Sequence, residues 1–241
     1  MLDMGDGYFR FKQFALSNRR SAMKVGTDGV LLGAWVDVDG ARRILDVGAG
    51  TGLIALMMAQ RSPSARVTAV EIDPEAAAEA RGNVAASPWA DRVEVVEGDF
   101  LSMAASMTPG FDLIVSNPPF FKETLRAPAA ARAAARHDAG SLPLDRLIDI
   151  AARMLSPMGR LAVIAPANRA DELDYIATLA RLSLLRLTRV FTAPGKPCKR
   201  CLWEWTRVGE GVTPVVDTMT LRAYDGSPSQ AYASLTADFY L

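Results

Sequence analysis

Cysteine is scarce in this sequence, and long hydrophobic runs are absent. Only two of its 241 residues are cysteine, so no disulfide framework is predicted. No apolar run approaches the roughly 18 residues that a membrane-spanning helix needs. The first residues, MLDMGDGYFRFKQ, lack the basic-then-apolar order of a secretion signal. We therefore expect a cytoplasmic protein without a membrane partner, and we infer no obligate protein partner.

The sequence also lacks an excess of either charge. Lys and Arg number 27, as do Asp and Glu, so the net charge is zero and does not by itself indicate a nucleic-acid partner. Half of the residues are apolar, which is enough for a sizeable core. No repeat or linker is evident, so one domain is expected over residues 1–241. Its expected parts are an N-terminal extension (1–40), a ligand-binding core (41–168) and a C-terminal part with helices and a hairpin (169–241).

Apolar runs alternate with helical patterns from residue 42 to about residue 165. The strand-like runs are 42–48, 66–72, 92–99, 111–117 and 159–166, and the helix-like stretches between them are 52–62, 74–87 and 142–155. Such alternation is typical of a parallel sheet with helices on both faces. Two later runs, 184–193 and 199–209, are joined by the turn-rich PGKPC and predict an antiparallel hairpin at the sheet edge. The expected fold is an α/β, doubly wound, Rossmann-like, mostly parallel sheet of seven strands with this C-terminal hairpin. A helix over 27–36 precedes it, with Thr27 or Asp28 as the expected N-cap.

The segment ILDVGAGTG follows a strand and opens a helix. Its small residues are Gly48, Ala49, Gly50 and Gly52. They allow a tight turn and a close approach of the backbone to a ligand. About 20 residues further on, the next strand ends in Glu71 and Ile72, where an acidic side chain binds ribose hydroxyls in nucleotide-binding sheets. The spacing predicts a nucleoside-containing ligand.

Acidic residues at strand ends favour S-adenosylmethionine (SAM) over a dinucleotide. Asp46 stands just before the glycines, where it would repel a pyrophosphate but suits a ligand with a sulfonium and an ammonium group. Asp99, followed by Phe100, ends the third strand, where a carboxylate can accept from an adenine amino group. The alternative is that Asp46 and Asp99 only cap helices or turns.

The fourth strand, FDLIVS, delivers Asn117, Pro118, Pro119 and Phe120 to its carboxyl end, where ligands of open α/β sheets bind. An amine on a planar ring is a poor nucleophile because its lone pair is delocalised. Two acceptors, the Asn117 side-chain carbonyl and the Pro118 backbone carbonyl, can draw its nitrogen toward tetrahedral geometry, and the prolines stiffen the loop. Phe120 offers a face on which a base stacks. The alternative is a surface turn that only ends a strand.

Together these motifs resemble the bacterial tRNA1(Val) (adenine-37-N6)-methyltransferase family over nearly the whole chain. The most specific matches are MKVGTDGVLLGAW and the C-terminal LTADFYL, supported by LDVGAGTGLIALMMAQR, SPWADRVEV and SNPPFF. The resemblance implies a class I SAM-dependent fold, with Lys24, Thr27, Asp28 and Gly29, as well as Asn117, at the cofactor. It implies methyl transfer to the adenine 3′ of the anticodon. The family often has tyrosine at the position of Phe120, a change that keeps stacking and loses a hydroxyl.

Basic residues gather in stretches that contain no acid. These stretches lie between Asp6 and Asp28, between Glu123 and Asp138, and between Asp174 and Glu204. Each alone is typical of a solvated face, but together they indicate a rim suited to a phosphate backbone. The predicted RNA contacts are Arg10, Lys12, Arg19, Arg20, Lys122, Lys196, Lys199 and Arg200. The predicted partner is tRNA, through its anticodon stem-loop.

Several features leave alternatives open. Phe9, Phe11 and Phe14 either stack on bases or anchor a core. Cys198 and Cys201 form a CxxC, but zinc needs about four ligands and no second pair exists, so no metal site is expected. His137, the one histidine, suits a phosphate contact or a surface role better than that of a general base, which is the other alternative. Other planar nitrogens remain possible targets: guanine N2 of rRNA, adenine N6 of DNA, or a glutamine amide. A non-catalytic RNA-binding protein is disfavoured by the intact asparagine.

Overall fold

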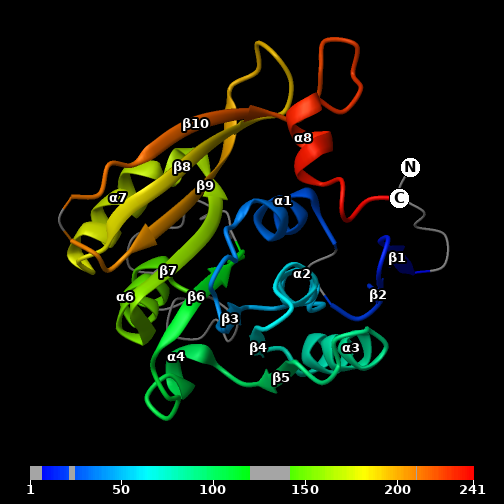
Figure 1. Cartoon of the computed structure of the whole chain (residues 1–241), viewed down its shortest axis with the longest axis vertical. Helices are drawn as coiled ribbons and strands as arrows, with labels where there is room; N and C mark the ends of the chain where they lie inside the picture. The colour runs from blue at the N-terminus through cyan, green and yellow to red at the C-terminus, as the bar shows by residue number, and fades with distance from the viewer. Residues whose placement is uncertain (1–6, 22–24, 120–141, 210) are drawn as a thin grey trace, which may run out of the picture.

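The computed structural model describes residues 7–21, 25–119, 142–209 and 211–241. Within these residues, the main feature is an eight-stranded sheet with the strand order β10-β8-β9-β7-β6-β3-β4-β5 (Figure 1). Its strands are β3 (Arg43–Val47), β4 (Arg66–Glu71), β5 (Val93–Glu97), β6 (Phe111–Ser116), β7 (Leu155–Pro166), β8 (Ser183–Phe191), β9 (Cys198–Thr206) and β10 (Val215–Thr220). The helices are α1 (Thr27–Trp35), α2 (Leu53–Arg61), α3 (Pro74–Ala85), α4 (Phe100–Met103), α6 (Leu144–Met154), α7 (Ala170–Leu179) and α8 (Gln230–Leu235).

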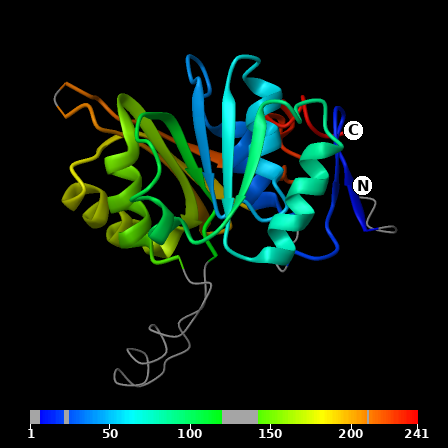
Figure 2. The same ribbon diagram turned by 90° about the horizontal axis from the view of Figure 1, so that it is seen from below.

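Strands β3 to β7 form the parallel part of the sheet, as the alternating sequence predicts. Each of the pairs β5–β4, β4–β3, β3–β6 and β6–β7 is parallel. Helices α1, α2 and α3 cover one face, and α6 and α7 cover the other (Figures 1 and 2). Neighbouring β3 residues Ile44 and Leu45 are buried in the cores on opposite faces, which is why apolar residues stand next to each other in this strand instead of alternating with polar ones. The α/β, mostly parallel fold is confirmed.

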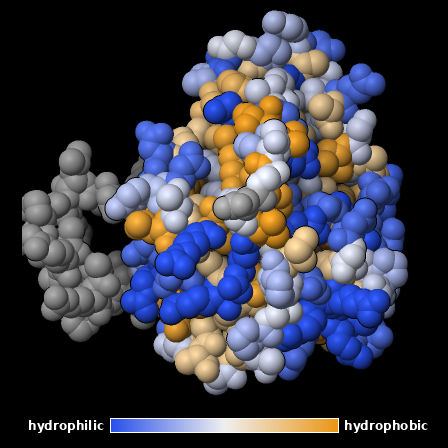
Figure 3. Space-filling model, turned by 60° about the vertical axis from the view of Figure 1, so that its left-hand side comes forward, coloured by the Kyte–Doolittle hydropathy of each residue, from blue (hydrophilic) through white to orange (hydrophobic). Residues whose placement is uncertain are grey.

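The C-terminal strands correct two details of the prediction. Strands β8 and β9 form the expected antiparallel hairpin. The hairpin does not lie at the edge, however, because β9 pairs with β7 and β10 pairs in parallel with β8. The edge strand is therefore β10, and the main sheet has eight strands in the described part of the chain instead of seven. Figure 3 shows polar and apolar side chains intermixed on the side of the molecule that carries this edge, where Val215 and Val216 are exposed.

The N-terminal aromatic residues belong to the core. The short strands β1 (Tyr8–Arg10) and β2 (Ala15–Ser17) pair with each other. Phe9, Phe11 and Phe14 are buried, with successive ring centroids 4.6 Å apart. Phe11 also stacks on Tyr240 near the end of the chain. Burial decides between the two alternatives: these rings anchor a core and are not available to stack on RNA bases.

Helix α1 begins at Thr27, as predicted, but its N-cap is Gly26, and no side chain caps it. The expectation of Thr27 or Asp28 as the cap was wrong by one or two positions, because both residues already lie in the first turn. Helix α3 does have a side-chain cap: Asp73 accepts from the backbone N–H groups of Glu75 and Ala76. In the described ranges, every helix is too short or too polar to cross a membrane.

Candidate active site

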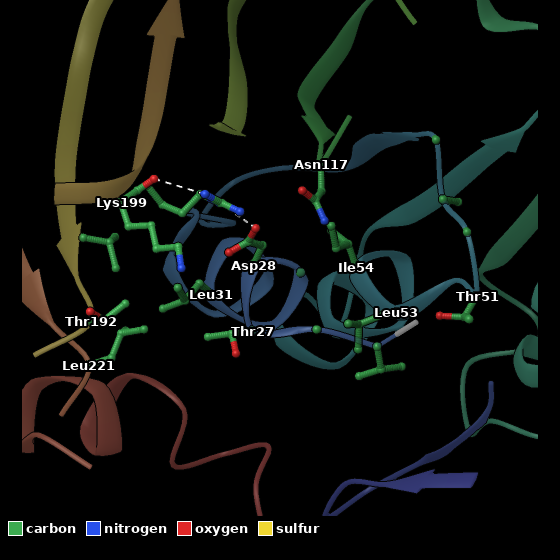
Figure 4. A pocket seen from close by; sticks show the side chains of 18 residues that line it. Thr27, Asp28, Leu31, Thr51, Leu53, Ile54, Asn117, Thr192, Lys199 and Leu221 are labelled. Atoms are coloured by element: carbon green, nitrogen blue, oxygen red, sulfur yellow. Dashed lines mark hydrogen bonds and ion pairs between the residues drawn. The ribbon is translucent and has the colours of Figure 1, made fainter. Parts of the chain in front are cut away.

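A cavity of about 480 Å³ opens at the carboxyl ends of the parallel strands (Figure 4). One wall is the start of α1, with residues 25–29 and Leu31. The floor is the glycine turn and the start of α2, with residues 48–51, Leu53 and Ile54. Asn117 enters from the end of β6. The far wall consists of residues at the ends of β8 and β10 and the start of β9: Val190, Thr192, Lys199, Arg200 and Leu221.

The glycine turn has the backbone geometry that its sequence predicts. Gly48, Gly50 and Gly52 have φ values of +74°, +55° and +82°, in the left-handed region that favours glycine. A β-carbon added at Gly48 would meet nothing within 4 Å, so the backbone there faces open space in the cavity wall. Gly50 donates its N–H to Glu71 Oε2 at 2.7 Å, which fixes the turn against the end of β4.

Asp46 is fully buried beneath this turn. Its Oδ2 accepts from the Ala55 N–H at 3.0 Å, so it holds the first turn of α2, while Oδ1 makes no hydrogen bond among the described residues. Burial raises the pKa of Asp46 to about 7; the Ala55 hydrogen bond lowers it, and the Glu71 carboxylate raises it. A buried, partly unsatisfied acid fits a cationic ligand above it.

The other two predicted acids already have partners in the protein. Glu71 Oε1 accepts from the Asp73 N–H at 2.9 Å, and Asp99 caps α4 by accepting from Leu101 N and Ser102 Oγ. Capping was the alternative considered for Asp99, and it is one of its roles. Carboxylate oxygens keep further lone pairs, so the ribose contact of Glu71 and the adenine contact of Asp99 stay predictions. These two acids, together with Ile72 and Phe100, lie outside the lining of the cavity.

Asn117 is the predicted catalytic residue that the structure places in the cavity. Ser116, the last residue of β6, is buried and donates its Oγ hydrogen to Val47 O at 2.8 Å, which ties the β6 tip to the strand before the glycine turn. Figure 4 shows the Asn117 amide directed into the cavity toward Ile54. Pro118 is buried and Pro119 half-buried behind it. Phe120 lies outside the described residues.

The first turn of α1 forms the opposite wall. Thr27, Asp28 and Gly29 all line the cavity, as the family resemblance implied. A β-carbon at Gly29 would stand 3.0 Å from Leu53 Cδ2 and 4.0 Å from Asn117 Nδ2, so glycine keeps this wall close to the asparagine. Lys24 lies outside the described residues.

Lys199 and Arg200, which are predicted RNA contacts, lie at the cavity. Both line the cavity, and Arg200 Nε pairs with Asp28 Oδ2 at 2.7 Å across it (Figure 4). The ion pair between Arg200 and Asp28 joins β9 to α1. Val190, Thr192 and Leu221 could not be predicted as site residues, because they reach the cavity only through the packing of β8 and β10.

The remaining predicted RNA contacts lie elsewhere. Lys196 is exposed on the turn between β8 and β9. Lys12 donates its Nζ hydrogen to Ala237 O at 2.6 Å. Arg19 lies over the Tyr8 ring, and the exposed Arg20 is 4.0 Å from Glu75. Arg10 is exposed on β1. Lys122 and His137 lie outside the described residues. The contacts of these residues with RNA therefore stay predictions.

The two cysteines are neighbours in β9. Their sulfur atoms are 3.8 Å apart, and Cys201 is buried. Burial, the main cause, raises the pKa of Cys201 to about 12, so its thiol stays protonated. Within the ranges that the structure describes, no three His, Cys, Asp or Glu side chains are grouped to hold a metal ion.

This fold and site define an α/β methyltransferase. The family model for the methyltransferase small domain matches residues 20–182. A predicted O-methyltransferase from Agrobacterium tumefaciens has a similar structure, with a TM-score of 0.66 at 22% identity, covering 88% of this chain and 96% of that one. A putative RNA methyltransferase from Pyrococcus horikoshii has a TM-score of 0.52 at 16% identity, covering 75% and 81%. These structural likenesses show the fold.

The curated relatives show to which family of methyltransferases the chain belongs. The tRNA1(Val) (adenine(37)-N6)-methyltransferase of Porphyromonas gingivalis is 49% identical over 96% of this chain and 94% of its own length. The enzyme of the same name from Aeromonas hydrophila is 46% identical over 97% of both. The chain belongs to the family of tRNA1(Val) (adenine(37)-N6)-methyltransferases. Its cofactor is SAM, and the open glycine turn above the buried Asp46 fits that cationic ligand.

Proposed function

We propose that this chain transfers a methyl group to N6 of adenine 37, the nucleotide 3′ of the anticodon, in tRNA1(Val). The observation that carries the proposal is the position of Asn117, which lines the same cavity as the glycine turn and the start of α1. The relatives that carry this activity in their names match nearly the full length of the chain. Their match includes both the cofactor half and the C-terminal strands.

The chemistry of the site follows from the acceptors at the β6 tip. SAM supplies an electrophilic methyl group when bound. The Asn117 side-chain oxygen accepts a hydrogen bond from one N–H of the target amine, and the Pro118 carbonyl accepts a hydrogen bond from the other. When the N–CH3 bond forms, the S–CH3 bond of the cofactor breaks, and the amine afterwards loses one proton to solvent. The nitrogen then becomes tetrahedral, and its lone pair becomes available for attack. The buried Pro118 and the Ser116–Val47 hydrogen bond hold this tip rigid. Phe120 is the proposed stacking surface for the adenine.

The proposed contact on the tRNA is its anticodon stem-loop. A base inside a duplex cannot enter the cavity, so the target must be unpaired or extruded. Loop bases meet this requirement because they can be splayed out of the RNA. Lys199 and Arg200 at the cavity wall, with Lys196 on the adjacent turn, provide positive charge where the phosphates flanking such a base would lie.

The decisive experiment measures transfer of a labelled methyl group from SAM to this tRNA. The expected result is incorporation into the wild-type tRNA and none into the same tRNA with guanine at position 37. An Asn117→Ala variant run in parallel shows whether the transfer depends on the site. Equal incorporation into both tRNAs would contradict the proposal. So would labelling of rRNA, DNA or a release-factor glutamine in place of tRNA, which would support one of the other planar nitrogens.

A further inference from the structure

One buried carboxylate, Glu79 of α3, holds the segment that follows β2. Its oxygens accept hydrogen bonds from Ser17 Oγ at 2.7 Å and from the backbone N–H groups of Arg19 at 2.6 Å, Arg20 at 3.1 Å and Ser21 at 2.8 Å. The Glu79 side chain comes from the middle of the helix, and only 6% of the residue is exposed. We call residues 17–21 the anchored segment.

The Glu79 bonds are strong because the acceptor is charged. Burial alone would raise the pKa of Glu79, but the hydrogen bonds from Ser21, Ser17, Arg19 and Arg20 lower it below its ordinary value. The successive N–H groups of the anchored segment form a concave anion site, and the protein fills this site with its own carboxylate. Replacing the carboxylate with an amide therefore removes the charge and one of the two acceptor oxygens, and sets an NH2 donor against backbone N–H groups that need an acceptor.

A second side chain on the same helix joins the anchored segment to the glycine turn. Asn83 accepts from Ser17 N at 2.7 Å and donates to Ser17 O at 3.0 Å and to Thr51 O at 2.9 Å. Thr51 lines the cavity. Asn83 is itself buried, so the anchored segment and the turn share one rigid support.

The anchored segment ends against the cofactor site. Ser21 is 2% exposed, and its Oγ lies 3.8 Å from the place that a β-carbon on Gly50 would occupy. Gly50 is thus held between Glu71, which accepts its N–H, and the end of the anchored segment. Farther along the chain, Val25 to Gly29 line the cavity. The anchored segment and the start of α1 thus both lie at the glycine turn.

We propose that Glu79 is a positioning residue for the cofactor: through the anchored segment it fixes the chain against Gly50 and Thr51, and so sets the affinity for SAM. Preorganised walls raise affinity because binding does not have to order them. Glu79 reaches the site only through these residues and is not in the cavity lining. The proposal goes beyond the proposed function and does not depend on which nucleic acid is methylated.

The test compares Glu79→Gln with Glu75→Gln. Glu75 lies one turn earlier on the same helix, but its side chain is exposed and is 4.0 Å from Arg20. We expect Glu79→Gln to raise the calorimetric Kd for SAM, measured without RNA, by roughly tenfold or more. Glu75→Gln should leave that Kd unchanged. Hydrogen exchange should show faster exchange of the Arg19, Arg20 and Ser21 amides in Glu79→Gln only.

The kinetic measurements separate positioning from general damage. With Glu79→Gln, the KM for SAM should rise while kcat at saturating SAM stays near the wild-type value. A wild-type Kd for SAM in Glu79→Gln would overturn the proposal, and so would a fall in kcat without a change in Kd. If Glu79→Gln does not fold, Ser17→Ala removes only the 2.7 Å hydroxyl bond and decides the question. A Kd raised a fewfold, roughly the loss of one bond to a charged group, supports the proposal, and an unchanged Kd overturns it.

Discussion

Asp46 illustrates how a single residue serves both the fold and the ligand. One of its oxygens holds α2 through Ala55, and the other is buried without a hydrogen bond among the described residues. Such a group costs stability when it is ionised in a protein that has no compensating charge. We propose that a cationic cofactor bound above the glycine turn supplies that charge. This role would explain why an acidic residue stands just before the glycines.

This explanation predicts a pH dependence of SAM binding. Burial raises the pKa of Asp46 to about 7 in the ligand-free protein, and the cationic ligand favours the ionised form. SAM affinity should therefore rise with pH up to about 7 and level off above it, with a slope of at most about tenfold per pH unit. Titration calorimetry at several pH values measures this profile.

Asp46→Asn is the control, since its amide oxygen still accepts from Ala55. Its affinity should be lower than that of the wild type at pH 8, and the difference between the two should shrink as pH falls to 6. The free energy of unfolding of the ligand-free protein changes in the opposite direction: it falls as pH rises, because Asp46 holds its proton more tightly in the folded state. The ordinary pKa of the carboxyl is 3.8, so its contribution to stability is fully present below that pH and is lost as pH rises through about 7. Parallel pH profiles for the two proteins would rule out ionisation of Asp46 as the cause.

A second residue-scale prediction separates chemistry from cofactor binding. Asn117→Ala removes one proposed acceptor for the target amine but leaves the glycine turn and the buried acids in place. Turnover should fall by at least about 100-fold, the scale of removing one preorganised catalytic hydrogen-bonding group. The Kd for SAM should remain close to the wild-type value. Single-turnover methylation and calorimetry measure the two quantities, and near-normal turnover would mean that the β6 tip is only a turn.

The site residues that could be predicted from the sequence share one property: each is recognised from the residues next to it in the chain. Asp46 lies in the last part of β3, and the glycines and Asn117 follow β3 and β6 directly, so strand order alone places them at the carboxyl ends of the parallel strands. Glu79 and Leu221 have no such signal. In the sequence, Glu79 looks like an ordinary helix residue, and only the structure shows that it lies beside the anchored segment. Leu221 reaches the cavity only because β10 pairs with β8.

At the scale of elements, the packing of α1 on α2 fixes the cavity wall. The two helices approach closely where Gly33 faces Met57. A β-carbon at Gly33 would stand 2.5 Å from Met57 Sδ and 3.2 Å from Met57 Cβ. Met57 is fully buried, so it has little room to move away. The glycines of α1 therefore serve helix–helix contact rather than backbone freedom.

Gly33→Ala should destabilise the protein although alanine is the better helix former. We expect the free energy of unfolding to fall by about 1–3 kcal/mol, the usual range for overpacking a core. The matched control is Gly82→Ala in α3, where an added β-carbon meets nothing within 4 Å. That change should raise stability by about 0.4–1 kcal/mol through the unfolded state. Urea denaturation measures both, and equal effects of the two substitutions would contradict the packing argument.

Strand pairing marks the limit of sequence-based prediction at this scale. The runs that became β8 and β9 were recognisable because they are long, apolar and separated by a proline-rich turn. Strand β10 was not recognised, because its sequence VVDTMT is short and three of its six residues are Asp or Thr. Its pairing with β8 is parallel and non-local, so no turn in the sequence indicated it.

At the scale of the whole molecule, the basic residues divide into different environments. Lys199 and Arg200 line the cavity, and Arg200 pairs with Asp28 near the cofactor wall. Reversing the charges of Lys196, Lys199 and Arg200 together would therefore disturb the cofactor site as well as any RNA contact. A test of RNA binding alone needs a basic side chain that lies at the same end of the strands as the cavity but does not line the cavity.

Lys196 meets this requirement. It is exposed on the turn between β8 and β9 and does not line the cavity. Lys196→Glu should weaken tRNA binding and reduce the slope of log affinity against log salt by about 1, as expected for the loss of one phosphate contact. SAM affinity should not change. Arg66→Glu is the control. Arg66 is the exposed first residue of β4, so it lies at the amino ends of the parallel strands, away from the cavity at their carboxyl ends. Filter binding of the tRNA over a range of salt concentrations measures both variants, and a similar loss of affinity in both would place the tRNA elsewhere on the molecule.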